Sequence, residues 1–193
     1  MNRRALILSA AGAGLAVTGL AAPSRTLAAQ TATDDELAYA NFGQATEFLL
    51  KDFYAKATAA KLARGSVTHS LARGAFNADE HARALGKLLT DAGQAAAVED
   101  DFQFAWPQGT FASAAAAAKT GLKITQALLG TYISAATTVS IPSYRALYAS
   151  MAANLAQQVG ALSALGGGRA VGVSFPPAVA VETASDAIEA YLG

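Results

Sequence analysis

The chain has 193 residues, of which 53% are hydrophobic, with 14 basic and 14 acidic side chains and no cysteine. This length suits one ordinary domain plus a short processed segment. The missing cysteine excludes disulfides, thiolate chemistry and cysteine-ligated zinc or iron–sulfur sites, and the lack of a basic cluster argues against a nucleic-acid-binding surface.

Residues 1–29 have the composition of an export signal peptide. Arg3 and Arg4 precede an apolar run rich in Ala and Gly, and small residues follow it, so we expect cleavage after Ala28 or Ala29. The arginine pair before a mildly apolar run resembles a twin-arginine signal; a Sec-type signal that carries two arginines is the alternative. Both interpretations predict an exported protein, periplasmic or secreted.

Residues 30–193 are predicted to form the domain. Removing residues 1–29 takes away three of the 14 basic residues and no acidic one, which leaves a net charge near −3. No later stretch is apolar and charge-free for long enough to span a bilayer. We therefore expect no membrane span once the signal is removed.

The domain is predicted to be a succession of helices. Thr33 and Glu36 have the spacing of a capping box and open a helix that runs to about residue 64. Ser66 is placed to cap a second helix, which Gly93 closes.

Two long helices and one short helix follow. The first is expected near residues 110–139, and Pro142, at a first-turn position, opens the next, which ends at the glycines 166–168. An extended segment with two prolines then leads to a short terminal helix at about residues 182–192.

Four such helices predict an all-α four-helix bundle. The connection between the second and third helices, residues 93–109, reaches roughly 55 Å when extended, whereas a helix of this bundle is about 40 Å long. It can cross the length of the bundle and join two helical hairpins, as in ferritin-like folds. We expect Phe102, Phe104 and Trp106 to hold this crossover against the bundle; an aromatic ligand site is the alternative.

The two halves of the domain resemble each other. TEFLLKDFYAKATAA, from Thr46, aligns with TQALLGTYISAATTV, from Thr125. EHARALGKLL, from Glu80, aligns with QQVGALSALG, from Gln157, at nearly the same spacing. We interpret this as an internal repeat of one helical hairpin.

The stretches NFGQATEFLLKDFYAKA and AFNADEHARALGKLLTDAG resemble the secreted ferritin-like family of exported bacterial proteins. That family shows Glu-x-x-Glu-x-x-Phe-Tyr on its first helix, which Glu47, Phe53 and Tyr54 match, and an acidic residue followed by His on its second. The terminal Phe-Pro segment also looks like that family, and the resemblance covers about residues 33–192. It implies a di-iron site with one Glu from each first helix and Glu-x-x-His from each second helix.

Several of the implied ligands are replaced in the first hairpin. The second Glu of the first-helix motif falls on Leu50, and Ala78 stands three residues before His81, where the motif needs Glu. Glu80 is adjacent to His81, so it projects about 100° away around the helix.

In the second hairpin none of the implied ligands is present. The counterparts of Glu47, Glu80 and His81 are glutamines, and a leucine stands where the other Glu is needed: Gln126, Gln157, Gln158 and Leu155. Glu47 and His81 alone remain in place, and two protein ligands do not hold two irons.

Surface ion pairs and core packing offer competing explanations for the remaining side chains. Glu47 lies four residues before Lys51, which suits a surface ion pair as well as an inward position. Glu80 precedes Arg83 by three residues, and we expect an exposed ion pair there. His81 lies on the apolar face, where a hydrogen-bonded core histidine is favoured over a metal ligand.

These observations favour a metal-free, exported bundle that serves as a non-catalytic binding or structural module. The alternative is a residual metal-dependent oxidase or peroxidase, in which Glu47 and His81, joined by Glu80, Asp79 or Tyr54, hold a single iron, manganese or zinc ion. The low charge density disfavours an iron-storage cage. We expect no cofactor, and a monomer or small homo-oligomer.

The sequence also predicts what replaced the metal. Buried polar groups without partners cost about 1–3 kcal/mol each. We therefore expect Glu47, His81, Gln126 and Gln158 to form one hydrogen-bonded polar core, because amides both donate and accept. Tyr54 should be buried nearby, with its hydroxyl bonded to a polar partner.

Overall fold

The computed structural model describes residues 31–193, so the predicted signal peptide, residues 1–29, lies outside the described residues. The described helices are α2 (Asp34–Ala59), α3 (Ser66–Asp91), α4 (Ala114–Thr138), α5 (Pro142–Leu165) and α6 (Val181–Ile188), with 3-10 turns η1 (Glu99–Asp101) and η2 (Glu189–Tyr191). Within residues 31–193, no helix has both the length and the apolar character needed to cross a membrane.

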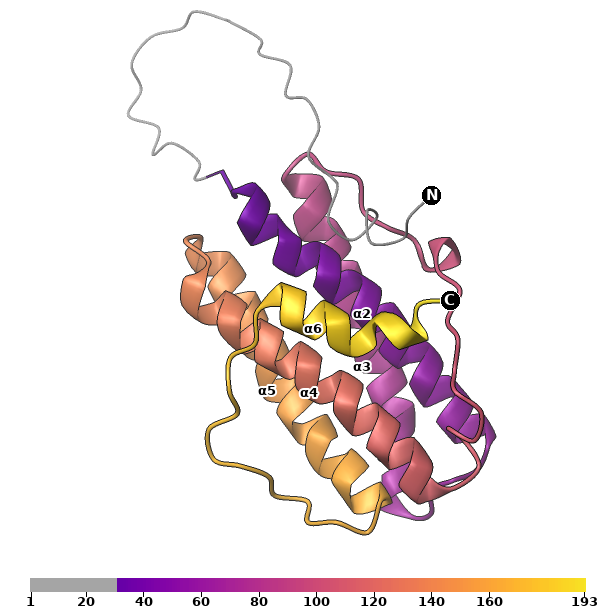
Figure 1. Cartoon of the computed structure of the whole chain (residues 1–193). Helices are drawn as coiled ribbons and strands as arrows, with labels where there is room; N and C mark the ends of the chain where they lie inside the picture. The colour runs from indigo at the N-terminus through magenta and orange to yellow at the C-terminus, as the bar shows by residue number, and fades with distance from the viewer. Residues whose placement is uncertain (1–30) are drawn as a thin grey trace, which may run out of the picture.

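The four long helices form a bundle, and α6 lies on its outside. α2 packs with α3 as one hairpin, and α4 packs with α5 as the other. The segment between α3 and α4 runs along the bundle, so that α3 and α4 point in the same direction (Figure 1). The predicted architecture, two hairpins joined by one long crossover plus a short C-terminal helix, is therefore confirmed.

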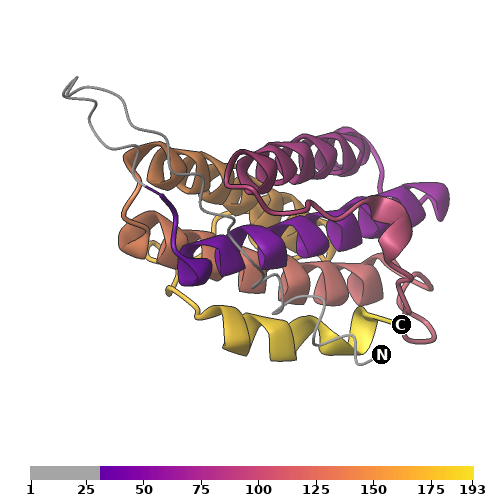
Figure 2. The same cartoon turned by 90° about the horizontal axis from the view of Figure 1, so that it is seen from above.

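The helices are arranged in layers. Seen from above, α3 and α5 form one layer, α2 and α4 form the next, and α6 covers the outer side of that second layer (Figure 2). α2 is consequently enclosed on several sides, and every residue from 42 to 50 is buried. The central turns of α2 therefore form the interior of the domain.

The boundaries of the first hairpin follow from local capping. Thr33 and Glu36 form the predicted capping box: the Thr33 N–H donates to Glu36 Oε2 at 2.9 Å, and the Glu36 N–H donates to Thr33 Oγ1 at 3.3 Å. α2 ends at Ala59, earlier than predicted, since Lys61 adopts a positive φ of 55°. Ser66 does not cap α3 as predicted: it is the first residue of the helix, no side chain caps it, and Gly65 at φ 58° supplies the turn instead.

Capping also sets the ends of the second hairpin. α4 begins at Ala114 rather than near residue 110, because the Ser113 hydroxyl accepts the N–H of Ala116. Pro142 occupies the first turn of α5, as predicted, and Gly167 at φ 78° follows the end of that helix.

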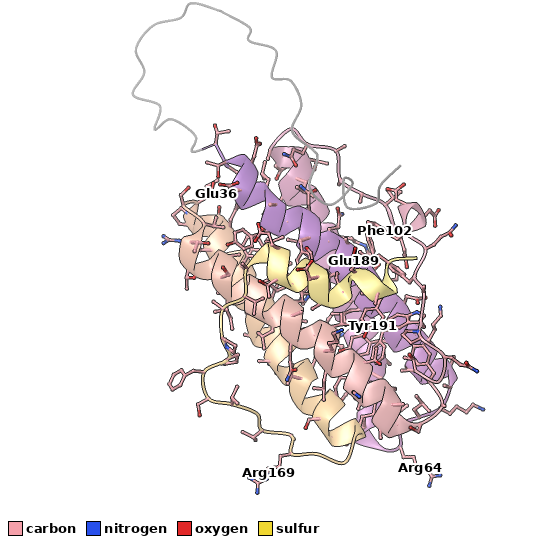
Figure 3. All side chains as sticks on the ribbon, viewed as in Figure 1. Glu36, Arg64, Phe102, Arg169, Glu189 and Tyr191 are labelled. Carbon is pink, nitrogen blue, oxygen red and sulfur yellow. The ribbon has the colours of Figure 1, made fainter. Side chains whose placement is uncertain are left out.

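Aromatic side chains hold the crossover against the bundle. The Trp106 indole N–H donates to Asp52 Oδ2 at 2.6 Å, and its ring centroid lies 5.7 Å from that of Phe53 and 5.5 Å from that of Tyr191. Phe102 contacts α2 through Phe48, with ring centroids 5.8 Å apart; Phe102 and Tyr191 are labelled in Figure 3. The predicted packing role of this aromatic group is confirmed.

Candidate functional site

Glu47 lies on the enclosed stretch of α2 with 0% of its surface exposed. Its Oε1 accepts a hydrogen bond from the Tyr132 hydroxyl at 2.9 Å and lies 2.9 Å from His81 Nδ1. It does not form the surface ion pair with Lys51 that its spacing allows, because Lys51 Nζ bonds Asp79 on α3 at 2.9 Å. One carboxylate oxygen thus joins α2, α3 and α4.

The surroundings of Glu47 shift the pKa of its carboxyl group in two opposing ways. Burial raises the pKa of the Glu47 carboxyl above its usual range, and the hydrogen bonds from His81 and Tyr132 oppose that rise. Burial also raises the pKa of Tyr132 well above its usual value, and the neighbouring carboxylate adds to the effect. Tyr132 therefore remains a protonated phenol that donates to Glu47.

The second oxygen of this carboxyl group has a different environment. Glu47 Oε2 is buried and has no hydrogen-bond partner among residues 31–193. A buried polar atom without a partner is costly. The cluster is therefore only half satisfied, and the donors of His81 and Tyr132 provide the stabilisation that Glu47 receives.

Glu80, the third residue considered as a metal ligand, lies apart from this cluster. It is 50% exposed and pairs with Arg83 at 2.5 Å. The expected exposed ion pair is confirmed. Adjacent positions on a helix differ by about 100°, which explains why Glu80 and His81 face different surroundings.

A second polar cluster lies beside the first and joins α2, α3 and α5. The Tyr54 hydroxyl donates to Gln158 Oε1 at 2.7 Å, and Gln158 Nε2 donates to Asn154 Oδ1 at 2.7 Å. Asn77 Nδ2 on α3 donates to the same Asn154 oxygen at 3.1 Å. The structure thus places Tyr54 in the core, with the polar partner that the sequence predicts, and Gln158 faces inward.

Gln126 contradicts the predicted four-residue polar core. It is exposed on the outer face of α4, where it lines a cavity that also involves the segment before α6. Its neighbour Thr125 is buried, so the repeat alignment that pairs Gln126 with Glu47 is wrong about which side of α4 faces inward. Glu47 and His81 do meet, but Gln158 belongs to the separate second cluster.

Sequence reasoning missed Tyr132 and Asn154, which complete the two clusters. Tyr132 lies seven residues after Thr125, two helical turns along the same buried face of α4. A buried tyrosine usually has a partner for its hydroxyl, so the position of Tyr132 on this face already indicated a buried hydrogen bond. Its partner depends on how α4 sits against α2, which the local pattern does not determine.

The residues present do not fit a di-iron site. No group of three or more His, Cys, Asp or Glu side chains within residues 31–193 is placed to hold a metal ion. Apolar side chains, all fully buried, stand at three of the implied ligand positions: Leu50, Ala78 and Leu155. The third group beside Glu47 and His81 is a phenol that donates a hydrogen bond.

Comparison with protein-family models, with characterised proteins and with solved structures finds no match for the chain. The proposed function therefore rests on the fold and the side chains of the chain itself.

Proposed function

We propose that the chain is an exported ferritin-like bundle that acts as a non-catalytic binding or structural module. The bonding of Glu47 carries this proposal. One oxygen of this carboxyl group already accepts from Tyr132 and contacts His81, so hydrogen bonds between helices occupy the position where metal ligands would converge.

In this proposal the two residues that match the ferritin-like pattern have a structural role. Buried polar groups must find partners, and they favour the one arrangement of helices in which the partners meet. His81 and Tyr132 can reach Glu47 only when α3 and α4 have the observed register against α2. The cluster thus fixes the packing of three helices.

The alternative is a residual oxidase or peroxidase, and the unpartnered Oε2 of Glu47 beside His81 favours it. Such a site needs a third ligand. The candidates have other partners: Glu80 and Asp79 pair with basic side chains, and Tyr54 donates to a glutamine. The arrangement supports the structural role better.

Metal analysis tests the proposal. The protein should be purified after export, without chelators, and its iron, manganese and zinc measured per chain. We expect no stoichiometric metal, and no ferroxidase or peroxide turnover after iron is added. Two metal ions per chain, or turnover that disappears in His81→Ala, would overturn the proposal and favour the oxidase.

A further inference from the structure

The segment Ala170 to Val179, which we call the strap, connects α5 to α6 and touches the second hairpin at two glycines. The Val179 N–H donates to the Gly130 carbonyl of α4 at 3.0 Å. A Cβ on Gly130 would overlap the Val179 side chain, and a Cβ on Gly160 of α5 would lie 2.5 Å from the Ala170 carbonyl oxygen. The absence of side chains at these two helix positions allows the strap to approach closely at both ends.

Between these two contacts the strap runs outward along the α4–α5 hairpin before it reaches α6 (Figure 1). A cavity of about 860 Å³ lies beneath it. Ala127, Ala156 and Val159 contribute to the floor from α4 and α5, residues of α6 form a wall, and Val171 and Val173 line it from the strap. The volume is within the range of about 300–1,000 Å³ that small-molecule sites have.

The chemistry of the cavity limits its occupant. Among residues 31–193, no charged side chain lines it, and the polar side chains that do are Gln126, Gln157, Ser174 and Thr183. Arg169, just before the strap, points away from the bundle (Figure 3). An ionised ligand would lose its hydration there without a counter-charge, so the walls suit an uncharged molecule.

The strap itself is unusually apolar for an exposed segment. Val171 is 86% exposed and Val173 is 72% exposed, although both line the cavity. Exposed apolar surface gathered at one site is typical of ligand-binding grooves. An occupant of the cavity would cover these two side chains, which have no such cover from the described residues.

We propose that the cavity beneath the strap binds an uncharged, elongated apolar molecule, namely a long alkyl or acyl chain that ends in a neutral hydroxyl or ester. Its chain contacts the alanine and valine side chains, and its polar end hydrogen-bonds Gln126 or Gln157, whose amides both donate and accept. The proposal rests on the proposed binding function and names its ligand class. The strap, fixed at both ends, leaves a roofed site for a small molecule.

A neutral fluorescent probe, N-phenyl-1-naphthylamine, tests the site on the full chain. We expect saturable binding of one probe per chain, with displacement by 1-dodecanol at concentrations at least ten-fold lower than those needed for dodecanoate at pH 8. Ala156→Phe should fill the floor and weaken probe binding at least ten-fold. Ala149→Phe, two turns earlier on the exposed face of α5 and outside the cavity, is the matched control and should bind like the wild type.

The results that would contradict the proposed ligand site differ from those that would contradict the proposed function. Absence of saturable probe binding, equal displacement by dodecanoate, or equal effects of the two substitutions would overturn the proposal. Concentration-dependent dimerisation that Ala156→Phe abolishes would show that a second copy of the chain occupies the face instead. The displacement of the probe by dodecanol and dodecanoate is measured on the wild type alone, so this comparison remains decisive if a variant fails to fold. Bound metal in the same samples would overturn the proposed function without altering the probe result.

Discussion

Replacing Tyr132 by Phe tests whether hydrogen bonds hold the centre of the bundle. The substitution removes the hydroxyl that donates to Glu47 Oε1 at 2.9 Å and leaves the ring in place. Both side chains are 0% exposed, so water cannot replace the lost donor without rearrangement. Leaving a buried acceptor without its donor costs about 1–3 kcal/mol, and we expect the free energy of unfolding to fall by that amount.

Tyr148→Phe is the matched control. Tyr148 is also 0% exposed, and its ring centroid lies 5.7 Å from that of Tyr132. Its hydroxyl, however, has no hydrogen-bond partner among residues 31–193. Removing a buried hydroxyl that has no partner relieves a desolvation cost, so the free energy of unfolding should stay the same or rise.

Urea unfolding followed by far-UV circular dichroism measures both variants. Equal m-values would show that the same surface is exposed on unfolding. We expect the two variants to differ by about 1 kcal/mol or more. If Tyr132→Phe lies within about 0.5 kcal/mol of wild type, as an ordinary surface substitution does, the Glu47 cluster does not stabilise the fold and the reasoning fails.

Two further substitutions test the polar clusters. Gln158→Ala removes the acceptor of the buried Tyr54 hydroxyl and should cost about 1–3 kcal/mol of unfolding free energy; adding Tyr54→Phe should recover part of that loss, and additive losses would argue against the pairing. Glu47→Gln tests the buried carboxyl group: because burial raises its pKa above 4.5, the folded protein binds more protons than the unfolded chain just above that pH. The unfolding free energy of the wild type, relative to that of the variant, should therefore fall as pH rises from 4.5 through the raised pKa and then level off. If urea unfolding gives the same difference in free energy between the two proteins across this pH range, Glu47 is not buried as described.

The helices can be predicted from sequence because their signals are local. The capping box at Thr33 and the proline at position 142 act within one turn of the chain, and both are found where expected. The crossover is predicted from its length and its aromatic residues alone. The start of α4 differs because two nearby hydroxyl residues compete: Ser113 caps the helix, while the Thr110 hydroxyl donates to the carbonyl of Pro107.

The site is only partly predictable, for a physical reason. Helical periodicity predicts that His81 and Gln158 face inward, and Glu47 is among the buried residues of α2. Periodicity does not predict which residue of another helix lies opposite each of them, since that depends on the axial shift between helices. The wrong prediction for Gln126 has this origin, because similarity of sequence between the two hairpins does not determine how far α4 is rotated about its axis.

The two clusters connect the second hairpin to the first at separate points. α4 is bonded through Tyr132 to Glu47, and α5 is bonded through Gln158 to Tyr54. Each helix of that hairpin thus has its own polar contact with α2, and its position is set from inside the bundle. The residues of α4 and α5 that line the cavity beneath the strap belong to neither cluster. On the proposals made above, this is how a bundle without a metal site keeps one stable arrangement while it binds a ligand on its outside.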